Sequence, residues 1–190
     1  MQPHTPLETL GLVGAVRARI TDADRAWMNT ALASEEGSFE CMDGGERGLL
    51  LAWRRPGTSP ESASLGKSIS GTQHVLVVGR VEYPSRSADD LANVLEREGE
   101  SAWSSLSGPC VVMTWSNRDR EHRFVRPASG QRVLFYARVS DGLLFASDAS
   151  TLVEHPEVDA RTDWRSAADH MALGHIYGEK TLFRGVQRLG

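Results

Sequence analysis

A continuous apolar run from Val75 to Val78, within His74-Val75-Leu76-Val77-Val78-Gly79, strongly limits the folds that are open to this chain. The run is rich in β-branched residues and does not alternate with polar ones, so it is predicted to be a strand that is buried on both faces. Such a strand needs structure above it and below it. The fold is therefore expected to stack several layers.

Three segments are predicted to be helices, because each begins at a hydroxyl N-cap and carries an apolar stripe. They cover residues 21–34, 87–99 and 162–173, and Gly99 and Gly174 end the second and the third. The caps are Thr21, Ser87 and Thr162. The stripes consist of Ala23, Trp27 and Ala31 in the first helix, which should pack on a sheet, then of Leu91, Val94 and Leu95, and last of Trp164, Ala167, Ala168 and Met171.

Strand-like segments fill much of the remaining chain. A short apolar strand is expected at 48–53, followed by a surface loop rich in Ser, Pro and Gly at 56–66. An antiparallel meander follows, with strands at 110–115, 122–125, 133–139 and 143–146. Strands with helices at both ends indicate two sheets enclosed by helices, so the expected class is α+β, a four-layer αββα sandwich of two antiparallel sheets.

Composition and charge exclude several classes of partner. A formal net charge of −4, with both signs interspersed, gives no broad positive field for nucleic acid or anionic membranes. Residues 1–6 do not resemble a signal peptide and no apolar run could span a membrane, so a cytoplasmic protein is expected. Cys41 and Cys110 are expected to be reduced, and no zinc-type spacing occurs.

Several candidate residues have simpler structural explanations. Thr5 and Thr9 would be nucleophiles only if proteolysis exposed them. Cys110, at the start of an apolar strand, is expected to be a buried hydrophobe rather than a nucleophile. His170 and His175 do not share a helix face as metal ligands would. Core packing is the favoured explanation for the five tryptophans, which are Trp27, Trp53, Trp103, Trp115 and Trp164.

Four motifs, met in order, resemble motifs of one enzyme family. The segment 10–14, Leu-Gly-Leu-Val-Gly, is similar to its Cys-Gly-Ile-x-Gly start, and 74–83 to its strand ending Asn-Gly-Glu-Ile-Tyr. Residues 106–108 resemble its Leu-x-Gly-x-Phe-Ala element. Residues 126–136 and 144–148 resemble Arg-Asp-x-x-Gly-x-x-Pro-Leu-Tyr-Tyr and Phe-Ala-Ser-Glu. The chain thus resembles the glutaminase half of asparagine-synthetase-like enzymes, which are class II glutamine amidotransferases with an N-terminal-nucleophile hydrolase fold.

The resemblance implies a lost active site. Leu10 stands where the family has its nucleophilic Cys, and nine residues precede it, so no terminal amine adjoins it as general base. Gly79 and Arg80 stand at the Asn and Gly of the oxyanion hole, and Pro127 replaces the Asp that holds the substrate ammonium group. Arg55 alone is retained, at the place of the carboxylate-binding Arg, and no metal ligand is expected.

The resemblance also implies a role beside a second domain. Within the family, such losses go with lasso-peptide cyclases and β-lactam synthetases, whose substrate supplies its own amine. The Ser-Gly-Gly-x-Asp-Ser pyrophosphate loop is not found in the sequence, so ATP and Mg are expected only in a C-terminal synthetase domain. Residues 181–190 resemble a connector and suggest truncation there.

The expected partners are that synthetase domain, a precursor peptide or biosynthetic partner proteins, and a second copy forming a homodimer. A free-standing binding module for a peptide or small ligand is the alternative function. The third possible function is that of an active glutamine amidotransferase, whose catalytic residues a misplaced alignment would have hidden.

Overall fold

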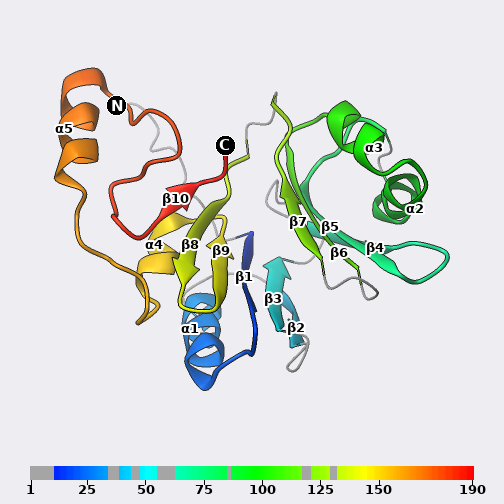
Figure 1. Ribbon diagram of the computed structural model, residues 1–190, viewed down its shortest axis with the longest axis horizontal. Coiled ribbons are helices and arrows are strands. Elements are labelled where there is room, and N and C mark those ends of the chain that lie inside the picture. Colours follow the sequence, from blue (N-terminus) through cyan, green and yellow to red (C-terminus); the bar gives the residue numbers. More distant parts are fainter. Residues whose placement is uncertain are drawn as a thin grey trace. The chain divides into compact units, whose positions relative to one another are not determined.

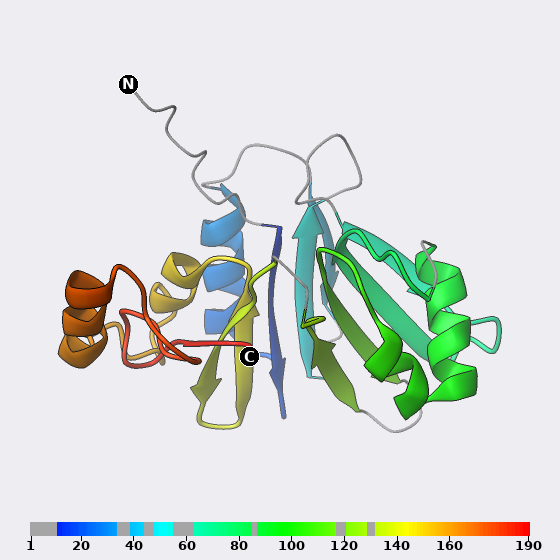
Figure 2. The ribbon, with the colours of Figure 1, turned by 90° about the horizontal axis from the view of Figure 1, so that it is seen from above.

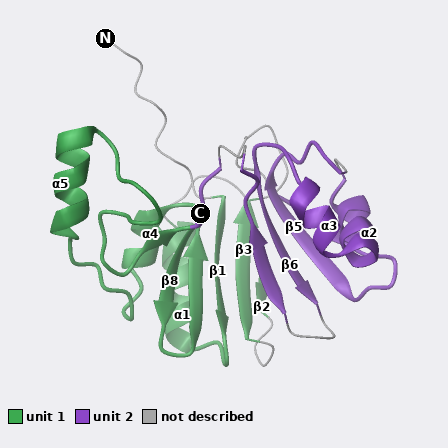
Figure 3. Ribbon diagram, turned by 45° about the horizontal axis from the view of Figure 1, so that its top comes forward, with its two compact units in different colours: residues 1–54, 135–188 green, residues 55–134, 189–190 purple. Residues whose placement is uncertain are grey.

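A computed structural model describes residues 11–33, 39–43, 48–54, 63–84, 87–116, 121–128 and 132–190. The chain divides into two compact units, one of residues 1–54 and 135–188 and the other of residues 55–134 and 189–190 (Figure 3). Each unit holds one sheet whose strands all pair antiparallel. The expected α+β class with two antiparallel sheets is therefore confirmed.

The sheet of unit 1 has the strand order β10-β8-β9-β1-β3-β2 (Figure 1). Its strands are β1 (Leu12–Arg17), β2 (Phe39–Asp43), β3 (Leu49–Arg54), β8 (Phe135–Val139), β9 (Gly142–Ala146) and β10 (Gln187–Arg188). Three helices belong to the same unit, namely α1 (Asp22–Ala33), α4 (Ala149–Val153) and α5 (Trp164–Leu173).

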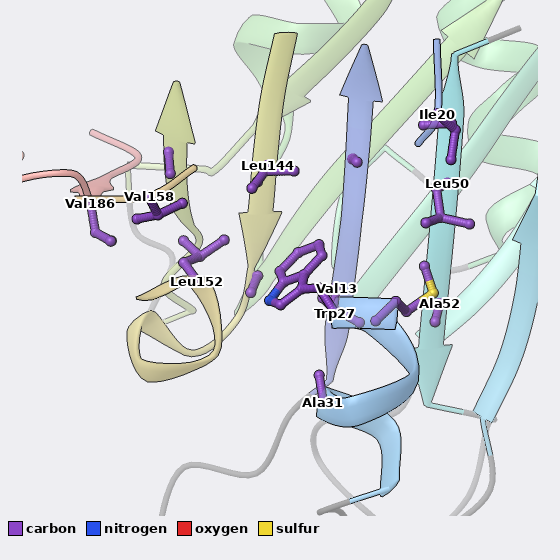
Figure 4. Close-up of a cluster of buried hydrophobic side chains, with 14 residues drawn as sticks. Val13, Ile20, Trp27, Ala31, Leu50, Ala52, Leu144, Leu152, Val158 and Val186 are labelled. Carbon is purple, nitrogen blue, oxygen red and sulfur yellow. The ribbon is translucent and has the colours of Figure 1, made fainter. Parts of the chain in front are cut away.

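The core of unit 1 lies between one face of this sheet and the helices α1 and α4, which lie on the same side of the sheet (Figure 2). Val13 of β1, Leu50 of β3 and Leu144 of β9 meet Trp27 of α1 and Leu152 of α4 there (Figure 4). Side chains alternate in direction along a strand, so residues two apart reach this common face. These strands are also buried on their other face, as the burial of Leu12 and Phe145 indicates.

Thr21 caps helix α1 as expected, because Thr21 and Asp24 bond to each other. The Thr21 hydroxyl accepts from Asp24 N–H at 3.2 Å, and the Asp24 carboxylate accepts from Thr21 N–H at 2.6 Å. The predicted stripe was partly wrong, since Ala23 is exposed and the buried residues are Asp24, Trp27, Met28 and Ala31.

The sheet of unit 2 has the order β4-β5-β6-β7. Its strands are β4 (Ala63–Lys67), β5 (Gln73–Gly79), β6 (Cys110–Ser116) and β7 (His122–Val125), and its helices are α2 (Ala88–Glu98) and α3 (Glu100–Ser105). Leu91 and Leu95 of α2 pack with Val75 and Val77 of β5, so one face of the sheet is covered by helix. Val75 to Val78 are all buried, as predicted.

Helix α2 has the predicted caps: the Ser87 hydroxyl accepts from Asp90 N–H, and Gly99, at φ 55°, ends the helix. The cap of α5 is Asp163 and not Thr162, because the Asp163 carboxylate accepts from the N–H groups of Arg165 and Ser166. A carboxylate one residue later outcompetes the hydroxyl for these donors. Gly174 ends α5 as expected, with φ 77°.

The predicted meander is divided between the two units. The strands β6 and β7 pair in unit 2, whereas β8 and β9 pair in unit 1, so the chain leaves one sheet for the other between them. The expected loop at 56–66 lies outside the described residues up to position 62, and residues 63–66 belong to β4 instead. No helix in the described part of the chain is long and apolar enough to cross a membrane.

Candidate functional site

The start of β1 is the place to which the sequence assigns the lost nucleophile, although Leu10 itself lies outside the described residues. The next two residues are held firmly. The Ser147 hydroxyl accepts from Gly11 N–H at 2.7 Å and from Leu12 N–H at 3.2 Å, and Gly11 C=O accepts from Arg54 N–H at 3.0 Å. Ser147 thus fixes the entry of the chain into β1 from the side of β9.

Glycine is required at position 14 because β1 is tightly packed between its neighbours. A Cβ atom added to Gly14 would lie 2.5 Å from the carbonyl oxygen of Leu50 and 2.5 Å from the ring of Phe145. Distances this short do not occur in packed proteins, so a larger residue would push β1, β3 and β9 apart. The glycine spacing of the sequence motif therefore has a packing cause.

Gly79 ends β5 at the place that the resemblance assigns to the oxyanion-hole Asn. Its φ is 89°, and a Cβ atom there would lie 2.3 Å from the carbonyl oxygen of Pro109. An amide-bearing side chain consequently has no room in this backbone. The residue contributes no side-chain donor.

Arg80 stands where the family's Gly amide would point at the oxyanion, and its N–H donates to the carbonyl oxygen of Pro109 at 3.2 Å. A backbone acceptor therefore already occupies this donor. The guanidinium forms an ion pair with Glu82 at 3.0 Å, and its side chain is 73 % exposed. Neither donor that an oxyanion hole needs is available at positions 79 and 80.

Pro127 lies at the same end of the sheet as Gly79. Both β5 and β7 run antiparallel to β6, where Cys110 is opposite Gly79 and Val112 is opposite Val125, so Pro127 follows β7 at the level of Gly79. Pro127 is buried and carries no charge that could hold an ammonium group. Arg55, the expected carboxylate ligand, lies outside the described residues.

Cys110 is the buried hydrophobe that its position predicted. It has no exposed surface, and burial together with the nearby charge of Glu82 raises the pKa of its thiol to about 11. A thiol with that pKa is protonated at neutral pH and is a poor nucleophile. Cys41 is exposed, and both cysteines are free, as expected.

The structure tests the explanation given for the tryptophans, whereas the expected lack of a metal site stays a prediction. Among the described residues, no group of three His, Cys, Asp or Glu side chains could hold a metal ion. Three tryptophans are buried, which are Trp27, Trp53 and Trp115, but Trp164 is 73 % exposed, so the prediction of core packing was wrong for it. The exposure arises because α5 turns its apolar stripe outward.

Sequence reasoning missed a buried polar network at the far end of β1. The Arg17 guanidinium contacts Asp24 at 2.9 Å, Asp141 at 2.6 Å and Glu157 at 2.8 Å, with its side chain 3 % exposed. His155 Nε2 lies 3.2 Å from the Asp24 carboxylate, while its Nδ1 accepts from Glu157 N–H. The sequence indicated only one part of this network, namely Thr21 and Asp24, whose spacing is typical of a helix cap.

The electrostatics of this network follow from burial and from the neutral imidazole. Since Nδ1 accepts a hydrogen bond, Nε2 carries the proton and donates it to Asp24. Burial lowers the pKa of His155 despite the attraction of Asp24. Burial acts to raise the pKa of Asp24, but the hydrogen bonds from Thr21 and Arg17 outweigh it and leave that pKa low. The network therefore has a structural role, and His155 is its one neutral titratable side chain.

Trp53 provides one more feature near the start of β1. It is opposite Leu12 in the ladder between β1 and β3, and its side chain is buried. Its indole N–H has no hydrogen-bond partner among the residues that the structure describes. Buried donors in native proteins are nearly always paired, so this donor is unusual.

Two antiparallel sheets, each with helices, are consistent with the framework of a glutaminase-like domain. A family model described as glutamine amidotransferase domain matches residues 77–190, which is more than half of the chain and includes Gly79, Arg80 and Pro127. The chain belongs to the glutamine amidotransferase domain family. A comparison with curated proteins finds no match.

Proposed function

We propose that this chain is a catalytically inactive glutaminase-like domain, the N-terminal part of an asparagine-synthetase-like, ATP-dependent amide-forming enzyme. The observation that carries the proposal is the hydrogen bond from Arg80 N–H to Pro109, next to a glycine at position 79. Loss of one oxyanion donor typically lowers a rate by about 100- to 1,000-fold, and here position 79 has no side-chain donor and the Arg80 N–H is already bonded to Pro109.

The other positions support the same inference. A hydrocarbon side chain at Leu10 cannot attack a carbonyl carbon. The buried Pro127 has no carboxylate for the ammonium group of glutamine. Nucleophile, oxyanion donors and the amine-binding charge are thus lost together, which is the pattern expected of a domain that no longer hydrolyses glutamine.

An intramolecular cyclase of the lasso-peptide macrolactam or β-lactam type fits this loss best. Without ammonia from glutamine, the attacking amine comes from the substrate itself. Its nitrogen forms a bond to the activated carboxyl carbon, and the bond to the leaving group breaks. ATP and Mg would belong to the synthetase domain, because the residues of this chain do not fit them: the sequence contains no pyrophosphate loop, and its described part holds no metal cluster.

The source of the nitrogen in the amide product can be tested with the parent enzyme. Given glutamine labelled with ¹⁵N in its side-chain amide, the enzyme is expected to form a product without the label and at the same rate when glutamine is omitted. Mass spectrometry of the product reads the result. A labelled product would overturn the proposal, because it would require release of ammonia from glutamine.

A second candidate, a ligand-binding module, is favoured by one observation. The buried indole N–H of Trp53 has no partner within the described part of the chain, and an acceptor on a bound ligand or peptide would satisfy it. L-Glutamine is the first probe to titrate, with intrinsic tryptophan fluorescence as the readout and Trp53→Phe as the matched variant. Saturable quenching that Trp53→Phe abolishes would favour this candidate, and an unchanged spectrum would remove glutamine as its ligand.

A further inference from the structure

Helix α5 turns its apolar stripe away from the rest of unit 1. Trp164 and Met171 are two turns apart on the same face and are 73 % and 87 % exposed, and Ala168 lies between them. The only buried residue of the helix is Ser166, whose hydroxyl donates to Asp163. The usual arrangement of a surface helix is thereby reversed. Figures 1 and 2 place α5 at the outer edge of its unit, beyond α4.

Further exposed apolar residues follow along the chain. Leu173, the last residue of α5, and Tyr177 are 53 % and 62 % exposed, and the rings of His175 and Tyr177 pack edge to face with centroids 4.1 Å apart. Leu173 lies half a turn around the helix from Trp164, so the residues that share one face are Trp164, Ala168 and Met171. Single exposed apolar residues are common, but several on one face mark an interaction surface. We call Trp164, Ala168 and Met171 the α5 patch.

Two opposite charges flank the patch on one side. Arg165 and Asp169 are one turn apart, and neither forms an ion pair with another residue in the described part of the chain. At 100° per residue both lie on the same edge of the stripe. In an antiparallel pair of identical helices, this edge of one helix meets the same edge of the other.

We infer that the α5 patch binds the α5 patch of a second copy of this chain, with the two helices antiparallel. A two-fold axis near Ala168 places Trp164 of one copy beside Met171 of the other, a favourable sulfur–aromatic contact. The same axis places Arg165 of one copy beside Asp169 of the other, twice. The small side chain of Ala168 lets the helices approach at the crossing point. The surface is therefore complementary to itself, as a two-fold interface requires.

The dimer is expected to be weak. One face of a ten-residue helix forms a smaller contact than the roughly 1,600 Å² of a standard stable interface. A dissociation constant in the micromolar range is therefore expected, and the monomer should predominate in dilute solution.

Sedimentation equilibrium of the 190-residue chain between about 1 and 500 μM tests the inference. A concentration-dependent monomer–dimer equilibrium is expected, and Trp164→Ser with Met171→Ser should weaken it at least tenfold. Ile69→Ser is the matched control, because Ile69 is 93 % exposed but lies in unit 2, and it should leave association unchanged. Circular dichroism verifies that each variant is folded.

A charge reversal tests the antiparallel arrangement itself. Arg165→Asp or Asp169→Arg alone places like charges together twice and should weaken the dimer, whereas the double variant should restore it. A chain that stays monomeric at all concentrations would overturn the inference, as would a dimer that survives the Trp164 and Met171 changes. A monomer that instead binds an isolated synthetase domain through these residues would assign the α5 patch to that domain.

Discussion

Gly79 determines whether Arg80 N–H can reach Pro109, so a side chain at this position is the sharpest probe of the relic site. Gly79→Asn introduces the residue that the family has in its oxyanion hole. It should lower the free energy of unfolding by at least about 2 kcal/mol. The positive φ and the Cβ clash at 2.3 Å both contribute. Urea unfolding measures the change.

Gly174→Asn is the matched control for that substitution. Gly174 also has a positive φ, of 77°, but a Cβ atom there meets nothing within 4 Å. Asn tolerates this left-handed conformation, so a cost of less than about 1 kcal/mol is expected. Equal costs at positions 79 and 174 would show that Pro109 does not exclude a side chain at Gly79.

Ser147 makes the second prediction at the scale of single residues. Ser147→Ala removes the acceptor of Gly11 N–H and Leu12 N–H and should destabilise the chain by about 1–3 kcal/mol. Ser104→Ala, which removes an exposed hydroxyl bonded only within α3, should cost less than about 0.5 kcal/mol. Chemical denaturation compares the two variants. An unchanged stability in Ser147→Ala would mean that this clamp at the start of β1 is not formed.

At the scale of helices and strands, local chemistry carried most of what the sequence could predict. Ser87 and Gly99 bound α2 because caps act within a few residues, and the Val75–Val78 run identified the buried strand β5. The cap of α5 was missed by one residue, because Thr162 and Asp163 are both good caps and only the geometry chooses between them.

The contacts that define the site were beyond the reach of the sequence. Arg80 N–H and Pro109 C=O are 29 positions apart, and they meet only because β5 and β6 pair in one register. The buried network has the same origin: Asp24 and His155 are 131 positions apart. The resemblance predicted which residues stand at the family's catalytic positions, and this stays a prediction; it could not predict that the Pro109 carbonyl oxygen accepts a hydrogen bond from Arg80 N–H.

The buried network makes stability depend on pH. Because the pKa of His155 is lower in the folded state than its ordinary value near 6.5, the unfolded chain binds the extra proton first. The stability that neutral His155 contributes is complete above about pH 6.5. It is lost as the pH falls toward the pKa that His155 has in the folded chain. The lowered pKa of Asp24 adds a further loss below about pH 4.

Denaturant unfolding between pH 4.5 and 7.5 checks this prediction. His155→Gln should flatten the decline of stability below pH 6.5, whereas His175→Gln, at an exposed residue, should leave the profile unchanged. Asp24→Asn should destabilise the chain by about 1–3 kcal/mol near pH 7, because it leaves the buried Arg17 guanidinium paired only with the partly exposed Asp141 and Glu157. A pH profile that is identical in His155→Gln and in the parent chain would contradict the assignment of a neutral, buried imidazole.

At the scale of the whole molecule, the two units have the framework expected of a glutamine amidotransferase domain, and the proposal is that the chemistry has been lost from it. Packing constraints explain why the framework persists: Gly14, Trp27 and Leu91 serve the cores and not the reaction. Gly79, Arg80 and Pro127, which stand at positions that the resemblance assigns to the reaction, are not members of these two cores.

Glutamate release from L-glutamine by the purified chain tests the central claim most directly. A coupled glutamate dehydrogenase assay over several hours is expected to show no release above a protein-free blank. The Leu10→Ala variant should give the same reading, because Leu10 takes no part in chemistry. Sustained release that scales with protein concentration would contradict the account, since it would require a nucleophile and an oxyanion hole that these residues do not form.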